Sequence, residues 1–225
     1  MKFNLSKNKK QNLVYSLKSN DETLIGLYIG IWCGDGTQYY DKGYRIKICC
    51  HDQDKELIEF YKFVLERLFG KSITHTNKGI GHQAYLRFNS KFIYNFVSNY
   101  VSYTKNKTYS ICLKNYFKKY SKNFLEGFIL GLALTDGYLK ERFYLNVISK
   151  KLAKNLSDAL LFVGLKPKHY VSRRKKYGWK DLYTVRLNKE DSKKLISILN
   201  SLLRRVKHDL DFRSLKYGLN FKKDL

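Results

Sequence analysis

The 225-residue chain is 44% apolar and 16% aromatic, which is enough to bury a core in one large domain or two small ones. It carries 44 Lys and Arg against 19 Asp and Glu, and this formal charge of +25 indicates an anionic partner, either nucleic acid or an anionic membrane surface. The sequence shows no signal peptide, membrane-length apolar run or Cys-x-x-Cys pair, so we expect an intracellular protein without a zinc ribbon or redox pair.

The first predicted helix follows an N-terminal extension, residues 1–21. The stretch LIGLYIGIWCGDG (24–36) is apolar nearly all round and ends in an acidic residue and a glycine, Asp35 and Gly36. A helix with no water-compatible face belongs in the centre of a fold.

Strand alternation and helical spacing predict the elements that follow. Within residues 44–50, Ile46 and Ile48 alternate with basic residues, as in a strand with one buried face. Apolar residues at three- and four-residue spacing predict a helix over 54–70, closed by Gly70. The same patterns predict strands near 71–77 and 83–89 and a helix over about 90–103.

A second apolar stretch, FLEGFILGLALTDG (124–137), restates the first at an offset of 101 residues, from Leu24 to Leu125. After it, strands are predicted over 142–149, 166–175 and 180–187, and helices over 150–164 and 189–206. Each half reads α-β-β-α-β-β-α. We therefore divide the chain into an extension (1–21), an N-terminal half (22–103), a linker (104–122), a C-terminal half (123–206) and a tail (207–225).

Small residues on one stripe of each apolar helix predict a close contact between the two helices, because backbones approach closely where side chains are absent. If the stripes pack on each other, Asp35 and Asp136 meet at the same end of the pair. Gly36 and Gly137 are then expected to adopt the left-handed turn that releases each helix into a strand. The glycines at the predicted interface are Gly26, Gly30, Gly127 and Gly131.

A metal site is predicted at Asp35 and Asp136. Two carboxylates at the negative ends of two helix dipoles repel each other, and a divalent cation between them removes the repulsion. The backbone carbonyls of Gly34 and Thr135, expected to be unpaired at the helix ends, would add oxygen ligands of the kind that Mg²⁺ prefers. No metal site is expected at the Cys-Cys-His stretch, 49–51, because adjacent strand residues point to opposite faces.

The motifs YIGIWCGDG (28–36) and ILGLALTDG (129–137) resemble the two nine-residue motifs of the LAGLIDADG homing endonucleases, and the chain is most similar to their monomeric, two-motif archaeal members. The resemblance covers about residues 22–206, including the element order of each half. It implies an α+β fold of two pseudo-twofold-related α-β-β-α-β-β-α repeats with saddle-shaped antiparallel sheets and centrally packed motif helices. It also implies a monomer.

The same resemblance implies Mg²⁺-dependent hydrolysis of both strands of a long, partly asymmetric DNA target, in the homing of an intron or intein. Asp35 and Asp136 match the family's metal-binding acids. A cation held between phosphate and water lowers the pKa of the water and neutralises transition-state charge. Basic residues are expected to assist at the phosphates, with Lys140, His51 and Lys150 as candidates.

Polar and basic side chains are predicted to line the face of each sheet that the helices leave open. Long side chains there can reach base edges in the major groove, Arg to guanine and Asn to adenine. A basic hairpin loop, SRRKKYGWK (172–180), is predicted to lie near phosphates. The predicted DNA-contacting residues are Arg45, Lys47, Tyr85, Arg87, Tyr144, Asn146, Ser172, Arg173, Arg174, Lys175, Lys180, Thr184 and Arg186.

Three other functions fit part of this pattern. A maturase that binds its host intron RNA as a splicing cofactor would share the fold and the charge, but both acids are intact, which favours cleavage. A non-catalytic DNA-binding regulator of the same fold usually lacks an acid and carries a helix-turn-helix domain. A binder of anionic membranes would need a basic amphipathic helix instead of basic strands. The host stays open, as does the choice between a prokaryotic cytoplasm and an organelle matrix.

Overall fold

The computed structural model describes residues 21–70, 77–79, 81–114, 119–139, 141–174, 178–207 and 211–217. Within these ranges the chain divides into two compact units, the first made of residues 21 and 36–99, the second of 22–35 and 100–217. The first motif helix therefore groups with the second unit. None of the helices in the described ranges has the length and apolarity that a membrane span requires.

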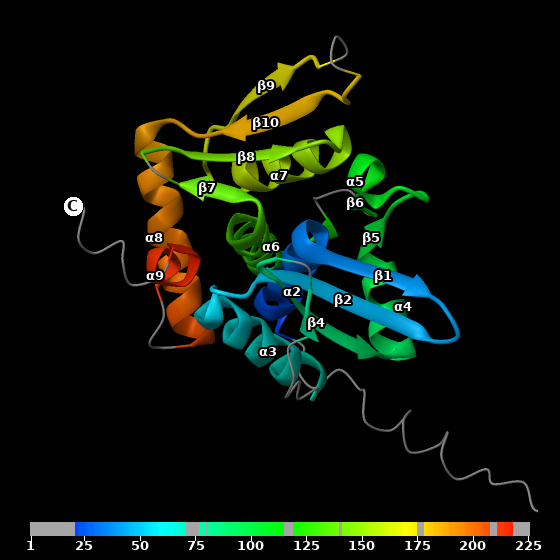
Figure 1. Ribbon diagram of the computed structural model, residues 1–225. Helices are drawn as coiled ribbons and strands as arrows, with labels where there is room; N and C mark the ends of the chain where they lie inside the picture. The colour runs from blue at the N-terminus through cyan, green and yellow to red at the C-terminus, as the bar shows by residue number, and fades with distance from the viewer. Residues whose placement is uncertain are drawn as a thin grey trace, which may run out of the picture. The chain divides into compact units, whose positions relative to one another are not determined.

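The first unit contains a four-stranded antiparallel sheet and two helices (Figure 1). In chain order its elements are β1 (Gly36–Tyr40), β2 (Tyr44–His51), α3 (Lys55–Phe69), β3 (Asn77–Lys78), β4 (Gln83–Asn89) and α4 (Lys91–Tyr100). The strands lie in the order β1-β2-β4-β3. Neighbouring strands in this order are joined by antiparallel hydrogen-bond ladders.

Alternation along β2 and β4 sets the two faces of this sheet. Ile46 and Ile48 of β2 are buried, and in the antiparallel register they lie opposite Phe88 and Leu86 of β4. The residues between them point to the other face. Helix α3 ends where Gly70 adopts a left-handed backbone with φ of 62°, which is the helix end that the sequence predicted.

The second unit holds the two motif helices and a second four-stranded antiparallel sheet, in the order β7-β8-β10-β9. Helix α7 packs on β8 and β10 (Figure 1). The core residues Phe143 and Leu145 of β8 and Val185 of β10 are fully buried. The elements are α2 (Glu22–Asp35), β5 (Val101–Ser102), α5 (Lys107–Ser110), β6 (Cys112–Leu113), α6 (Lys122–Thr135), β7 (Gly137–Leu139), β8 (Phe143–Val147), α7 (Lys150–Phe162), β9 (Lys168–Ser172), β10 (Leu182–Arg186), α8 (Lys189–Val206) and α9 (Phe212–Tyr217).

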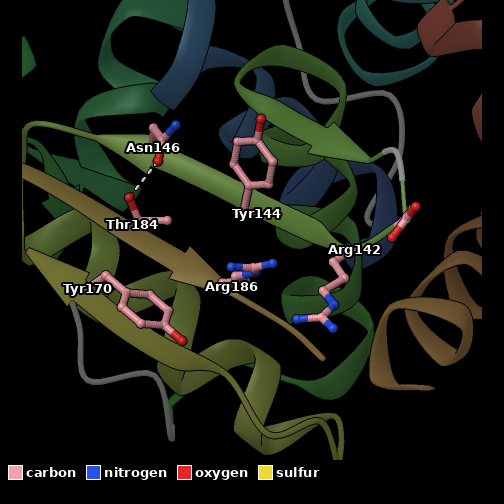
Figure 2. A pocket seen from close by; sticks show the side chains of 7 residues that line it. Arg142, Tyr144, Asn146, Tyr170, Thr184 and Arg186 are labelled. Carbon is pink, nitrogen blue, oxygen red and sulfur yellow. Dashed lines mark hydrogen bonds between the residues drawn. The ribbon is translucent and has the colours of Figure 1, made fainter. Parts of the chain in front are cut away.

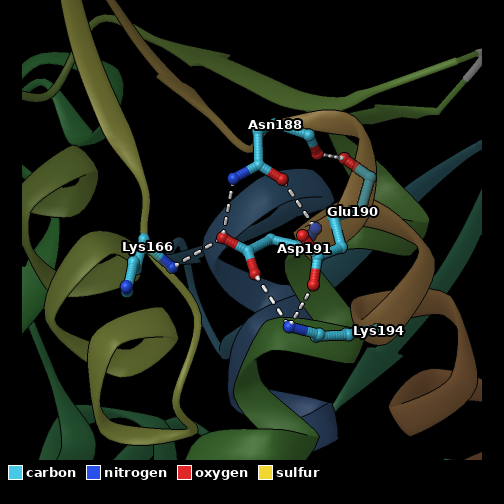
Figure 3. Close-up of polar contacts among 6 residues, drawn as sticks. Lys166, Asn188, Glu190, Asp191 and Lys194 are labelled. Carbon is cyan, nitrogen blue, oxygen red and sulfur yellow. Dashed lines mark hydrogen bonds and ion pairs between the residues drawn. The ribbon is translucent and has the colours of Figure 1, made fainter.

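A buried carboxylate ties the start of α8 to the strands β9 and β10. Asp191 is 5% exposed, and its N–H donates to the side chain of the helix cap Asn188 at 2.7 Å. The Asp191 carboxylate accepts from the Asn188 amide at 3.1 Å and from the Lys166 N–H at 3.2 Å, with Lys194 at 3.8 Å (Figure 3). Asn188 follows β10 and Lys166 precedes β9, so these bonds hold the two strands that carry predicted DNA contacts.

The two sheets have the same strand order when the strands are numbered within each unit. In each unit, one helix lies between the two strand pairs along the chain. This confirms the α+β fold with repeated units and antiparallel sheets that the sequence predicted.

Two predicted elements differ in extent from the structure. The helix predicted over about 90–103 ends at Tyr100, because Val101 and Ser102 pair with Leu113 and Cys112 as the two-stranded sheet β5-β6. The strand predicted near 71–77 is described only as β3, since residues 71–76 lie outside the described residues.

The predicted left-handed turns after the motif helices are wrong. Neither Gly36 nor Gly137 has a positive φ, and each is the first residue of a strand. Gly137 is needed for a different reason. A Cβ added there would stand 2.6 Å from the Cα of Ala133, so only glycine lets the chain turn tightly against the end of α6.

Candidate metal centre and nucleic-acid interface

Helices α2 and α6 pack on each other along the predicted glycine stripes. A Cβ added to Gly26 would meet the backbone of Phe124, and one added to Gly127 would meet the backbone of α2. In the middle of the contact, a Cβ added to Gly30 would stand 2.9 Å from the Cα of Gly131. The neighbours are backbone atoms, so these positions leave no room for a side chain.

The same contact brings together the C-terminal ends of the two helices. A Cβ added to Gly34 would meet the side chain of Thr135. Asp35 is the last residue of α2, and Asp136 is the residue after α6. The two aspartates therefore lie at the same end of the helix pair, as the repeated motif predicted.

Two lysines that sequence analysis did not single out also reach this end of the helix pair. Lys107 of α5 donates from Nζ to the carbonyls of Trp32 and Gly34, both at 3.0 Å, and its ammonium lies 4.9 Å from the Trp32 ring centroid. Lys216 of α9 donates to two carbonyls at the end of α6, including that of Thr135 at 2.6 Å. Positive charge at helix C-termini is favourable, because it opposes the negative end of the helix dipole.

The expectation that the carbonyls of Gly34 and Thr135 are unpaired is therefore wrong. Each carbonyl accepts a hydrogen bond from a lysine ammonium. The carboxylates of Asp35 and Asp136 are the oxygen donors at this end that carry negative charge, and they are the groups best suited to a divalent cation.

The surroundings of the Asp136 carboxyl disfavour its negative charge. Although Asp136 is exposed as a residue, desolvation by the surrounding protein raises the pKa of its carboxyl above the usual range, while the charges of Lys107 and Lys216 lower it. The desolvation effect is the largest, so the lysines compensate for only part of the cost of the negative charge. A divalent cation would supply the remaining positive charge.

This pKa predicts a dependence of stability on pH. An acid whose pKa is raised by folding stabilises the folded state while it is protonated, and this stabilisation is lost as pH rises from the ordinary aspartate range through the folded pKa. We expect Asp136→Asn to have a higher Tm than the wild type at pH 7 in chelator and to lose that advantage at low pH. Thermal unfolding between pH 3 and pH 8 measures this difference. An equal Tm at pH 7 would contradict it.

The cysteine nearest this site is a poor metal ligand. Burial raises the pKa of the Cys33 thiol to about 12, with Asp136 and Cys112 adding to the rise and Lys107 opposing it. The thiol therefore stays protonated at neutral pH, whereas metal binding requires a thiolate. The available donors are carboxylate oxygens, which suit Mg²⁺ better than softer metals.

The three basic residues predicted to assist catalysis have different placements. His51 ends β2 in the first unit, where its Nδ1 lies 3.5 Å from the Asp52 carboxylate. Lys150 is exposed and is the first residue of α7, next to the cap residue Ser149. Lys140 lies outside the described residues.

On the sheet of the first unit, the predicted DNA-contacting residues share the face opposite the core. Lys47 lies across from Arg87 in the β2–β4 register, and its ammonium stands 3.3 Å from the centroid of the Tyr85 ring. Arg45 follows the same alternation and pairs with Asp41 at 3.0 Å. The face therefore presents cations supported by an aromatic ring and an acidic residue.

On the sheet of the second unit, the open face carries a hollow of about 660 Å³ (Figure 2). Thr184 donates to the Asn146 side chain at 2.6 Å across the β8–β10 pair. Arg186 lines the hollow, and its buried Nε has no hydrogen-bond partner among the described residues. The lining residues are Glu141, Arg142, Tyr144, Asn146, Tyr170, Thr184 and Arg186.

Part of the predicted basic loop is described. Ser172 ends β9 and Arg173 follows it, and the Arg174 guanidinium lies 5.7 Å from the ring centroid of Trp179. Trp179 is 62% exposed, so its ring is open to a partner. Lys180 places its ammonium 5.7 Å from the ring centroid of Tyr109, and Lys175 lies outside the described residues.

A protein-family model described as the LAGLIDADG-like domain matches residues 22–101 and 123–200. Among solved structures, mesophilic variants of the homing endonuclease I-DmoI share 19% identity at a TM-score of 0.62, covering 81% of this chain and 98% of that chain. A complex of I-DmoI with DNA and Ca shares 18% identity at a TM-score of 0.60, covering 81% of this chain and 92% of that chain. The homing endonuclease I-WcaI, bound to its DNA recognition sequence, shares 14% identity at a TM-score of 0.58, covering 96% and 94%.

These structural similarities establish a shared fold, and the family model covers both halves of the chain. No curated protein sequence matches significantly.

Proposed function

The chain belongs to the LAGLIDADG-like domain family, and on this premise we propose that it is a site-specific, Mg²⁺-dependent endonuclease that cuts both strands of DNA, acts as a monomer and serves intron or intein homing. The observation that carries the proposal is the meeting of Asp35 and Asp136 at one end of the α2–α6 pair. Both motif acids are present, whereas we would expect a non-catalytic relative to lack at least one of them.

The residues at this end fit a divalent cation. Asp35 and Asp136 would hold it, since their carboxylates are the negatively charged oxygen donors at this end, and burial raises the pKa of the Asp136 carboxyl. When bound, such a cation lowers the pKa of an attacking water and neutralises charge on the phosphate.

Lys107 and Lys216 would add fixed positive charge beside the scissile phosphates. Each ammonium donates to carbonyls at the end of a motif helix, so its position is set before any substrate arrives. Preorganised charge of this kind stabilises the negative charge that develops on phosphate in the transition state, because no reorganisation is needed at that moment. The pairing of one lysine with each motif helix matches a reaction that cuts two strands.

The open faces of the two sheets would bind the DNA duplex. Lys47 and Arg87 offer charge for phosphate contacts, and the hollow of the second unit offers the amide of Asn146 and the guanidinium of Arg186. A mixture of charged and hydrogen-bonding groups is what reading of base edges requires. With a net charge of +25, binding is expected to weaken steeply as salt is raised.

Replacing Arg186 with alanine is expected to lower DNA affinity by about tenfold or more, the cost of losing one good base or phosphate contact. Lys193→Ala is the matched control, since it removes an exposed cation from α8 and not from the sheet face. Mobility-shift titrations at one fixed salt concentration, with a Tm for each variant, make the comparison. Equal losses in both variants would show that the hollow has no special role.

Plasmid DNA that carries the uninterrupted insertion site tests the proposed function. We expect the protein to linearise this plasmid in Mg²⁺ and to leave it intact in chelator. A splicing assay with the host intron RNA, run in parallel, distinguishes a maturase. Splicing without cleavage would overturn the endonuclease assignment.

A further inference from the structure

A second cluster of metal-ligating side chains lies in the first unit, away from the motif aspartates in sequence. It consists of His51 at the end of β2, Asp52 in the turn that follows and His82 in the turn before β4. Within the described residues, these three make up the one group of at least three such side chains whose ligand atoms all lie within 4.8 Å of one another. Neither Cys49 nor Cys50 belongs to it.

The distances within the cluster match those around a tetrahedral metal ion. The Nδ1 atoms of His51 and His82 lie 3.5 Å and 3.4 Å from the same carboxylate oxygen, Asp52 Oδ1. Zinc bonds to nitrogen and oxygen of about 2.0–2.1 Å at tetrahedral angles separate neighbouring ligand atoms by about 3.3–3.4 Å. The two imidazoles stack, with ring centroids 5.2 Å apart and an interplanar angle of 20°.

The central oxygen of the cluster lacks a hydrogen bond. Asp52 Oδ1 is buried and has no hydrogen-bond donor among the residues that the structure describes. The N–H of Gln53 donates to His51 Nδ1 at 3.3 Å, which identifies this nitrogen as the one that carries the lone pair. A cation bound between His51 Nδ1 and Asp52 Oδ1 would replace the long Gln53 hydrogen bond at the nitrogen and would satisfy the carboxylate oxygen.

The backbone holds the three side chains together. The Asp52 N–H donates to the His82 carbonyl at 2.8 Å, and His51 pairs with Gln83 in the β2–β4 register. The ligands thus come from two adjoining turns already joined by hydrogen bonds, so a metal ion would need little rearrangement. The side chains are 46%, 37% and 68% exposed for His51, Asp52 and His82, which leaves a path for entry.

Charge and ligand chemistry favour a transition metal here. The stretch HDQDKE (51–56) concentrates acidic residues within a strongly basic chain, and this lowers the local repulsion of a cation. Imidazole nitrogen with one carboxylate suits Zn²⁺, whereas Mg²⁺ prefers an all-oxygen shell. Three protein ligands leave the fourth tetrahedral position to water.

We propose that His51, Asp52 and His82 form a Zn²⁺ site, distinct from the Mg²⁺ site at the motif aspartates, that clamps the end of β2 to the start of β4. This proposal does not depend on nuclease activity. Binding of the metal to the folded state alone stabilises that state.

Titration of the tag-free, full-length protein with Zn²⁺ and with Co²⁺ as a spectroscopic probe tests the site. We expect one strong site per chain, visible Co²⁺ absorption typical of tetrahedral coordination, and a Tm increase of roughly 5–10 °C at a hundredfold excess over Kd. His82→Ala should weaken Zn²⁺ binding by about 100-fold or more, since loss of even an outer partner costs 10–100-fold.

Two variants serve as controls. His169→Ala removes a histidine whose Nε2 contacts Ser157 at 2.5 Å and should bind Zn²⁺ as the wild type does. Asp136→Asn should also keep this site, so failure of the endonuclease proposal and failure of the zinc proposal give different results. Unchanged Zn²⁺ affinity in His82→Ala, or no Zn²⁺-dependent change in the wild type, would overturn the proposal.

Discussion

Replacing Asp136 with asparagine is expected to slow DNA cleavage by about 1000-fold or more, because removal of one preorganised group in a charged transition state already costs 100- to 1000-fold. Asparagine keeps the size of the side chain and its acceptor oxygen but removes the negative charge that would hold the cation. Asp35→Asn should behave in the same way, since the two acids lie at the same end of α2 and α6. Single-turnover cleavage of the target DNA, followed with a saturating amount of protein, measures the rate.

The same variants should still bind the target. DNA affinity in Ca²⁺ or chelator is expected to stay within about threefold of the wild type, because phosphate contacts dominate affinity. Asp158→Asn is a suitable control, since it removes a carboxylate that pairs with Lys154 on α7. Cleavage by Asp136→Asn at the wild-type rate would mean that Asp136 does not hold a catalytic metal.

Adding a single methyl group at Gly131 is expected to be strongly destabilising. A Cβ there would stand 2.6 Å from the nitrogen of Ile31 and 2.8 Å from the carbonyl carbon of Gly30. Both are backbone atoms of α2, so the whole helix would have to move. We expect Gly131→Ala to lower the free energy of unfolding by about 3 kcal/mol, the upper end of the range for overpacked cores.

Gly43→Ala is the matched control for this prediction, because a Cβ at Gly43 meets nothing within 4 Å. Urea unfolding of the two variants should show a large drop in midpoint for Gly131→Ala and almost none for Gly43→Ala. Gly131→Ala should also lose cleavage activity, since the shift in α2 displaces Asp35 relative to Asp136. Equal midpoints would contradict the close backbone packing of α2 and α6.

The motif repeat made much of the site predictable from sequence. A glycine stripe with an acid at its end, stated twice, predicts both the helix contact and the meeting of Asp35 and Asp136, because helical spacing determines which residues share a stripe. Alternation similarly predicts the face of Lys47 and Arg87 in the first unit. These are local signals, and they need no knowledge of distant contacts.

The lysines at the helix ends could not be found in this way. Lys107 comes 72 residues after Asp35, and Lys216 comes 80 residues after Asp136, so the repeat at 101 residues does not align them. Lys216 lies in the tail beyond the recognised repeat. Only tertiary contacts place their ammonium groups on the carbonyls of α2 and α6.

Tyr170 and Arg142 of the hollow were not predicted from the sequence, for other physical reasons. Every residue of β9 is exposed, so burial does not alternate along it, and nothing in the sequence distinguishes Tyr170 from its neighbours. Arg142 lies in the turn between β7 and β8 and enters the hollow only through the strand pairing. The cluster of His51, Asp52 and His82 likewise depends on the β2–β4 register, which brings together residues that are about 30 positions apart.

The central claim is that the two motif aspartates support cutting of both DNA strands at one site. Sequencing the ends of target DNA after incubation with the protein in Mg²⁺ tests this claim most directly. We predict a single double-strand break within the uninterrupted insertion site, absent in chelator and absent with Asp136→Asn. Intact DNA in Mg²⁺, under conditions in which a mobility shift shows that the wild-type protein has bound the same DNA, would contradict it.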